Sequence, residues 1–233
     1  TVFLQLVLMI MKFAPVGVFC LIGKFVITDG FNIFQDVFMY VILLISVLLF
    51  HAFVTYSLIL RFFASINPLH FFYKMKDAAI FAFSTSSSAA TIPVTLRTVN
   101  QDLGVNQNVA SFVVPVGATI NMDGTAIMQG LATVFIAQIS GIDLTLFQYI
   151  QVVLLAVATS IGTAAVPSAG TITLIIILQQ FNLPLEAIGI ILAVDRVLDM
   201  IRTSVNVTGD AAIACIVAKT ENQLDENIFN SKA

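Results

Sequence analysis

Long apolar runs constrain the fold of this chain more than any other feature. Residues 37–60, 109–139, 152–178 and 185–217 consist mainly of apolar side chains, and a helix needs about 20 such residues to cross a bilayer. Only 10% of the residues are charged, whereas soluble domains carry about 25%. We therefore predict an all-α integral membrane protein with several transmembrane helices. The net charge of −3 gives no reason to expect a nucleic-acid partner.

Two apolar stretches are interrupted by similar small and hydroxylated residues. Residues 89–93 read AATIP and residues 163–167 read TAAVP, and a polar residue follows each proline by 28 positions, at Asn121 and Asp195. Lys and Arg occur in 61–97 and in 219–233 but are absent from 140–151 and 179–186, which places the first two regions in the cytoplasm by the positive-inside rule. We predict two re-entrant helical hairpins that enter from opposite faces, which is an inverted repeat.

These patterns predict an order of segments. Residues 1–32 are expected to form a scaffold-type transmembrane helix, and residues 33–218 a core. The core is divided into a helix, a first hairpin at about 66–103, a broken helix at about 105–140, a second hairpin at about 145–182 and a last helix at about 185–218. Residues 61–77 are expected to be a polar connection, and 219–233 a solvated, partly disordered cytoplasmic tail. Because the chain begins in an apolar run without Met, we expect it to be the carboxy-terminal part of a longer protein.

A polar stripe runs along the last predicted helix. Its members are spaced by four, three, four and four residues and lie within roughly 80° of one another on a helix; they are Asp195, Asp199, Arg202, Asn206 and Asp210. Charged groups within a membrane cost at least about 2.5 kcal/mol each and persist where they face a cavity, a partner or an ion. The stripe therefore predicts a site for a ligand that is charged at several points.

Arg202 has two interpretations. Its guanidinium could be held by Asp199 in the empty protein, or it could bind a carboxylate of the substrate through two parallel hydrogen bonds. Thr203 and Asn206 add hydrogen-bonding groups beside it, and we favour the second interpretation for that reason.

Three other polar clusters interrupt the apolar runs. Residues 84–88 offer five hydroxyls at a hairpin tip, where helix N–H groups would attract a carboxylate; the alternative is that the hydroxyls only satisfy backbone carbonyls. A catalytic serine is disfavoured, because no His or Lys is placed to activate it. Residues 121–125 supply an amide, a carboxylate and a hydroxyl, a hard oxygen site suited to Na⁺, unless they only kink the helix. Residues 160–163 are a weaker candidate, and the isolated His51 and His70 are given no metal role.

The combination of these motifs resembles the dicarboxylate/amino acid:cation symporters, the glutamate transporter family. The resemblance is carried by Asn121–Thr125 (NMDGT), by Ser86, Ser87 and Ser88, by Val166–Gly170 (VPSAG) and by Asp199–Asp210 (DMIRTSVNVTGD). It implies that the serine tip and the tip formed by Val166, Pro167, Ser168, Ala169 and Gly170 enclose an acidic amino acid. It further implies that Thr125 and Asn206 hold the α-groups, Asp199 the ammonium, and Arg202 with Thr203 the side-chain carboxylate.

The resemblance also implies three cation sites. Gly117, Asn121, Asn206 and Asp210 would form one Na⁺ site, and Thr119, Ser160, Ile161 and Thr163 a second. Asp123 and Asn121 would contribute to a third. Ala89 departs from the pattern, because many members have a serine or glycine there.

The function expected from the resemblance is Na⁺-coupled symport of glutamate or aspartate, not enzymatic catalysis. The resemblance implies residues 33–218 as a transport core, an elevator-like movement, a homotrimer, and a place in the plasma (inner) membrane with the carboxy terminus in the cytoplasm. Three alternatives are H⁺-coupled uptake of the same substrates, an ion channel, and an intramembrane aspartyl protease. The last is remote, because Thr208-Gly209-Asp210 lacks the Gly-x-Gly-Asp-like pattern.

Overall fold

The computed structural model describes residues 33–231 and five single positions nearer the amino terminus: Val16, Phe19, Cys20, Gly23 and Ile27. The scaffold-type helix predicted at 1–32 therefore lies almost entirely outside the described residues. Every regular element in the described part is helical, and one isolated β-bridge pairs Val105 with Leu224. The all-helical prediction is confirmed for this part of the chain.

A long apolar helix opens the described part. α3 (Ile33–Phe50) continues without interruption through the π-helical turn η1 (His51–Thr55), through α4 (Tyr56–Ile59) and through a second π-helical turn, η2 (Leu60–Ala64). Among the described residues, this 32-residue helix is the one that is long and apolar enough to cross a membrane, judged by length and composition. It ends at Ser65, which adopts a left-handed conformation with φ of 54°.

The polar connection predicted at 61–77 is wrong, because only residues 65–67 are non-helical there. Asn67 accepts a hydrogen bond from Leu69 N and Pro68 occupies the first turn, so the Asn-Pro pair starts α5 (Pro68–Thr85) at once. Lys74, which a solvated connection would expose, is only 6% exposed.

Two pairs of contacting helices form hairpins. α5 is joined through Ser86 and Ser87 to α6 (Ser88–Arg97), which continues as the π-helical turn η3 (Thr98–Asp102). α9 (Leu146–Ile161) and α10 (Ala169–Gln180) are joined by the longer segment 162–168. The first tip is tight, because Ser86 is left-handed at φ 51° and Ser87 Oγ accepts a hydrogen bond from Ala90 N.

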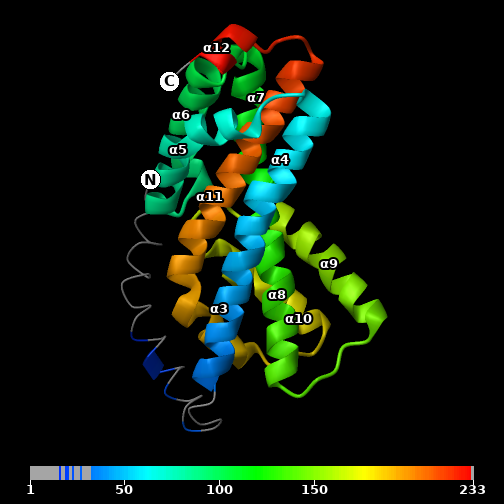
Figure 1. The fold of residues 1–233 in the computed structure, drawn as a ribbon. Helices are drawn as coiled ribbons and strands as arrows, with labels where there is room; N and C mark the ends of the chain where they lie inside the picture. The colour runs from blue at the N-terminus through cyan, green and yellow to red at the C-terminus, as the bar shows by residue number, and fades with distance from the viewer. Residues whose placement is uncertain (1–15, 17–18, 21–22, 24–26, 28–32, 232–233) are drawn as a thin grey trace.

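The remaining helices lie between and after the hairpins. They are α7 (Gln107–Ile120), α8 (Asp123–Ile139), the 3₁₀ turn η4 (Leu185–Ala187), α11 (Ile188–Thr220) and α12 (Glu226–Asn230). α11 contacts α3, α5, α7 and α8, so it forms the axis of the molecule. α5, α6 and α12 gather at one end, and α9 and α10 lie at the other (Figure 1).

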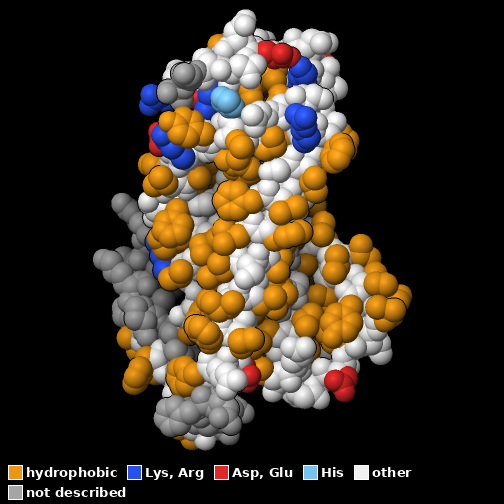
Figure 2. All heavy atoms as spheres, viewed as in Figure 1, with side chains coloured by type: hydrophobic (Ala, Val, Ile, Leu, Met, Phe, Trp, Pro, Cys, Tyr) orange, Lys and Arg blue, Asp and Glu red, His pale blue; other side chains and the backbone are white. Residues whose placement is uncertain are grey.

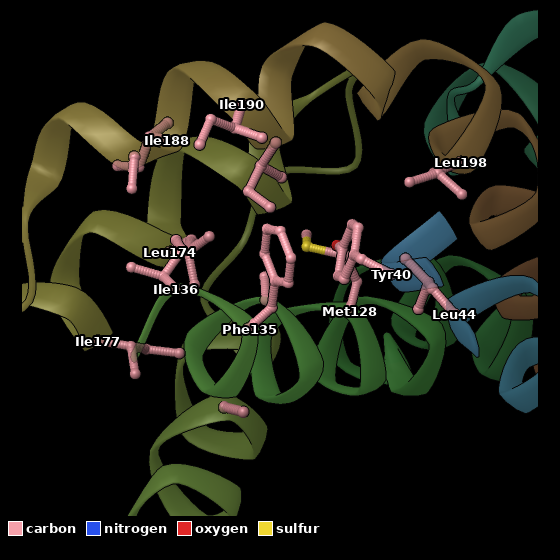
Figure 3. Close-up of a cluster of buried hydrophobic side chains, with 14 of the residues drawn as sticks. Tyr40, Leu44, Met128, Phe135, Ile136, Leu174, Ile177, Ile188, Ile190 and Leu198 are labelled. Carbon is pink, nitrogen blue, oxygen red and sulfur yellow. The ribbon is translucent and has the colours of Figure 1, made fainter. Parts of the chain in front are cut away.

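Two apolar clusters correspond to these two ends. The first joins α3, α8, α10 and the first half of α11, and contains the stacked rings of Tyr40 and Phe135, whose centroids are 4.9 Å apart (Figure 3). The second joins α5, η3, α7 and the second half of α11. Since α7 and α8 fall in different clusters, the break between them lies where the clusters meet.

Nine of the eleven side chains at 221–231 are exposed, as expected of a solvated tail, but the segment is ordered and contains a short helix where partial disorder was predicted. Asp225 accepts hydrogen bonds from Asn227 N and Ile228 N at the start of α12. Phe229 is only 1% exposed and belongs to the second apolar cluster. Phe229 therefore provides the buried apolar contact of a segment whose other side chains are mostly exposed.

Apolar side chains cover much of the outer surface (Figure 2). Phe38, Phe62, Phe112 and Leu146 are each at least 63% exposed. Soluble proteins rarely expose contiguous apolar patches of this kind, so this surface is suited to contact with lipid. On the visible face, most Lys and Arg side chains gather at the α12 end (Figure 2).

Candidate functional site

A small buried cavity lies between the two hairpin tips and the middle of α11. Its volume is about 20 Å³, which is room for about one water molecule. The residues that line it are Ser86, Ser88, Met122, Thr125, Ala165, Val166, Gly170, Asp199, Arg202, Thr203 and Asn206. The other predicted substrate residues, Ser87, Pro167, Ser168 and Ala169, belong to the same two tips but do not line the cavity.

Arg202 is the cation of this cavity, and it is 3% exposed. Its Nη2 donates to Asp199 Oδ1 at 2.5 Å, and its Nη1 lies 3.7 Å from Asp195 Oδ1. Nη1 itself has no hydrogen-bond partner, and neither has Oγ of Ser86, which also lines the cavity. Because buried polar groups are nearly always hydrogen-bonded, two unpartnered groups at one cavity indicate a site for a ligand with acceptor atoms.

The second hairpin closes onto this charged cluster. Ser168 N donates to Asp199 Oδ2 at 2.9 Å, and Thr171 Oγ1 donates to Asp195 Oδ1 at 2.6 Å. A Cβ atom at Gly170 would lie 2.7 Å from Thr125 Cγ2, so only glycine permits this approach of the tip to α8. The tip therefore covers the cavity by direct contact with α8 and α11.

The two hairpin tips also contact each other. Ser87 Oγ donates to Ala165 O at 2.8 Å, and Ala89 N donates to the same carbonyl at 3.3 Å. Residues 89 and 165, which lie in the two similar sequence stretches, thus meet directly. Ala89, the position that departs from the expected pattern, contributes its backbone here.

The break between α7 and α8 meets α11 at Asp210. Asn121 Nδ2 donates to Asp210 Oδ1 at 3.1 Å, and a Cβ atom at Gly117 would lie 2.6 Å from the same oxygen. Gly117 O accepts a hydrogen bond from Asn121 N at 2.8 Å, and the carbonyls at this end of α7 form the negative end of the helix dipole. Three of the four residues predicted for the first cation site are thereby brought together around one buried carboxylate.

Asn206, the fourth residue, lies one turn earlier on α11 and makes different contacts. Its Oδ1 accepts from Gly124 N at 2.8 Å, and its Nδ2 donates to Thr125 Oγ1 at 3.3 Å. A Cβ atom at Gly124 would lie 2.8 Å from Asn206 Oδ1. Asn206 therefore connects the first turn of α8 to α11, between the cavity and Asp210.

Of the residues predicted for the second cation site, Thr163 N donates to Ser160 O at 3.1 Å, but in the described part of the chain Thr119 forms no hydrogen bond with either of them. Thr119 donates to Val116 O, Ser160 to Val157 O and Thr163 to Thr159 O, each at 2.8 to 2.9 Å and within its own stretch of chain. Ile161, the last residue of α9, is 46% exposed.

Asp123 has two partners that the sequence did not suggest. Tyr56 OH donates to Asp123 Oδ2 at 2.7 Å, and His51 Nε2 lies 2.7 Å from the same oxygen. His51 and Tyr56 are five residues apart and would face different ways on an α-helix. The π-helical turn η1, with its i→i+5 hydrogen bonds, widens the helix and brings both to one side.

Comparison with known proteins gives a consistent result. The Sodium:dicarboxylate symporter family matches residues 1–220. The chain is 44% identical over 218 residues to an excitatory amino acid transporter of Caenorhabditis elegans, covering 93% of this chain and 43% of that protein. It is 45% identical over 216 residues to excitatory amino acid transporter 2 of Mus musculus, covering 92% and 38%.

Excitatory amino acid transporter 3 of Mus musculus is 41% identical over 231 residues, covering 98% of this chain and 44% of that protein. The chain thus spans about two fifths of the length of these curated relatives. The family match covers nearly all of the sequence, including both hairpins, the helix break and the polar stripe of α11. The chain therefore belongs to the sodium:dicarboxylate symporter family.

Proposed function

We propose that this chain forms the substrate- and ion-binding part of a Na⁺-coupled symporter for acidic amino acids, glutamate or aspartate, and that it is not part of an enzyme. The observation that carries the proposal is the buried Arg202 guanidinium, whose Nη1 makes no hydrogen bond and which lines the same cavity as Ser86, whose Oγ also makes none. A guanidinium and a hydroxyl suit a side-chain carboxylate. The names of the relatives, excitatory amino acid transporters, support the same substrate class.

Binding would replace the Arg202–Asp199 ion pair by two ion pairs with the substrate. Arg202 and Asp199 neutralise each other in this structure. An acidic amino acid brings an ammonium, which Asp199 can accept, and a carboxylate, which Arg202 can bind. Both interpretations of Arg202 would then describe stages of one cycle, and neither buried charge is left alone at any stage.

The cavity of about 20 Å³ is too small for an amino acid, so the site must open. The second tip is the candidate gate, because it has seven consecutive non-helical residues, 162–168, whereas the first tip has two. In our proposal the two hairpins are re-entrant, and the core moves in an elevator-like way against a homotrimeric scaffold. The protein lies in the plasma membrane, with its carboxy terminus in the cytoplasm.

The cations are proposed to bind beside the cavity. Gly117 and Asn121 carbonyls with Asn206 and Asp210 would hold one Na⁺, because a buried carboxylate with carbonyl oxygens suits a hard cation. Thr119, Ser160, Ile161 and Thr163 would form the second site after a rearrangement, and Asp123 with Asn121 would contribute to the third.

Uptake of labelled glutamate and aspartate by the full-length protein in liposomes tests the proposal. Uptake is expected only with an inward Na⁺ gradient. Uptake driven instead by a proton gradient without Na⁺ would indicate H⁺-coupled symport, and the absence of uptake under both gradients would contradict the assigned substrate.

Gly117→Ala is expected to raise the Na⁺ concentration for half-maximal uptake about tenfold or more. The added Cβ would lie 2.6 Å from Asp210 Oδ1 and 2.9 Å from its Cγ, and must therefore displace the carboxylate from the cation site. A loss of 1.4 kcal/mol in cation binding corresponds to about tenfold in affinity. Uptake measured across a Na⁺ series gives the shift.

Gly130→Ala is the matched control, because nothing lies within 4 Å of a Cβ atom there. Both substitutions add one methyl group inside a helix, where Ala is preferred over Gly. Equal Na⁺ curves for the two variants would contradict the close approach of Gly117 to the cation site.

A second prediction concerns the gate. A Ser168→Cys variant in the full-length protein should react with an impermeant thiol reagent added outside, and Na⁺ with glutamate should protect it. A Ser87→Cys variant should react only from the cytoplasmic side. Labelling of both from one side would contradict opposite entry of the two hairpins, and with it the inverted repeat.

A further inference from the structure

Residues 221–231, here called the tail, fold back onto the base of the first hairpin. Asp225 N donates to Gly104 O at 2.8 Å, and Asn106 N donates to Gln223 O at 3.0 Å, on either side of the Val105–Leu224 bridge. Gly104 has φ of +73°, and a Cβ atom there would lie 2.5 Å from Asp225 O. Backbone contacts of this closeness require glycine, so the tail is specifically seated.

Lys74 connects three separate parts of the chain at this place. From the middle of α5, its Nζ donates to Asp102 O at 2.8 Å, to Ile228 O at 2.6 Å and to Ser231 Oγ at 3.4 Å. Asp102 is the last residue of η3, which ends the second arm of the hairpin, and Ile228 lies in α12. One ammonium therefore joins both arms of the hairpin to the tail.

The apolar contacts of the tail reinforce this connection. Phe229 is 1% exposed and shares a cluster with Phe71 and Met75 of the first arm and with Val99 and Leu103 of the second. The Phe229 ring lies under the Lys74 ammonium, with its centroid 5.9 Å from Nζ, within the range of a cation–π interaction. The charged and the apolar contacts thus meet at the same point.

We propose that Lys74 is a positioning residue that, with the tail, clasps the base of the first hairpin. The clasp keeps the two arms together, so the tip at Ser86–Ser88 moves only as a rigid unit and opening is confined to the second tip. This inference rests on the proposed gating function. At the base of the second hairpin, among the described residues, the Thr145–Gln148 capping box lies within one arm and does not join the two arms.

The test measures the two tips separately. In the full-length protein with Cys20→Ser and Cys215→Ala, the Ser87→Cys and Ser168→Cys reporters are each combined with Lys74→Met, which removes the ammonium and keeps an unbranched side chain. The labelling rate of the position 87 reporter from the cytoplasmic side should rise about tenfold or more, since hydrogen bonds to a charged group hold the base closed. The rate of the position 168 reporter from outside should not change.

Lys76→Met is the matched control. Lys76 lies two residues further along the same helix and is exposed, and its Nζ lies 4.4 Å from the centroid of the Tyr73 ring. Neither reporter should change with this variant. Lys74→Arg keeps a charged hydrogen-bond donor at the same place. The position 87 reporter should therefore be labelled as slowly in this variant as in the protein that retains Lys74.

Phe229→Ala removes the apolar contact of the tail with the base of the first hairpin. It tests the same proposal if the Lys74→Met variant does not fold. It should also accelerate labelling at position 87 alone. Unchanged labelling at position 87 in a folded variant would overturn the clasp, and equal acceleration at both tips would show that Lys74 only stabilises the whole fold. Because labelling needs no substrate, these outcomes remain distinguishable from a failure of glutamate uptake.

Discussion

Arg202→Ala is expected to abolish uptake of acidic amino acids while leaving Na⁺ binding and membrane insertion intact. The substrate carboxylate would lose its only buried cationic partner among the residues that line the cavity. Truncating one member of a buried charge pair costs about 2 to 5 kcal/mol, or roughly 30-fold to several-thousand-fold in affinity. Isotope uptake and equilibrium binding of glutamate measure the loss.

The variant also leaves two buried carboxylates without a cation, which can destabilise the fold. The double variant Arg202→Ala with Asp195→Asn removes one of these charges and separates loss of folding from loss of binding. Asp199 would still accept an ammonium, so we expect a small neutral amino acid to bind to the variant.

Arg196→Ala is the control, because Arg196 lies on the same helix and is exposed. It should keep wild-type uptake. Unchanged glutamate affinity in folded Arg202→Ala would contradict the assignment of the carboxylate to Arg202.

The main site residues could be predicted because their spacing is a local property. Helical periodicity alone places Asp195, Asp199, Arg202, Asn206 and Asp210 on one side of a helix, and the structure has all five in α11, each at most 4% exposed. The helix break was similarly visible, because Asn, Asp and Gly compete with helical hydrogen bonding. The α7–α8 break falls at Asn121 and Met122.

The contacts that were missed depend on long-range geometry or on helix irregularity. His51 and Tyr56 meet Asp123 from 72 and 67 residues away, and only a π-helical turn puts them on one side. The order of residues 221–231 was not expected, because the average polarity of the segment hides the buried side chain of Phe229. The burial of Lys74 was not expected, because it depends on backbone carbonyls near helix ends, distant in sequence, that accept hydrogen bonds from its ammonium.

The geometry of the cavity could not be predicted from the sequence, for a different reason. Residue types indicate what a site can bind, but the pairing of Arg202 with Asp199 and the volume of about 20 Å³ depend on how the tips close. The same residues would line a larger space once the second tip moved. The sequence thus indicates which residues come together in the middle of α11 and at the tips, but not the conformation of the cavity that they line.

Asp210→Asn is expected to shift the Na⁺ dependence of uptake to concentrations at least about tenfold higher. The substitution keeps the size of the side chain and an oxygen near Asn121, but it removes the charge. A unit charge at about 4 Å contributes about 4 kcal/mol at an effective dielectric constant of 20, and half of that exceeds the 1.4 kcal/mol needed for a tenfold change.

Substrate affinity should fall together with Na⁺ affinity at fixed Na⁺, because two ligands that stabilise each other do so reciprocally. Saturating Na⁺ should therefore restore glutamate affinity in Asp210→Asn, which a general folding defect would not allow. Asp143→Asn, at an exposed position between α8 and α9, removes the same charge far from the site and should leave both curves unchanged. If Asp210→Asn keeps the wild-type Na⁺ curve but alters the response of uptake to pH, the Asp210 carboxylate carries a proton rather than binding Na⁺, and coupling to H⁺ becomes the better account.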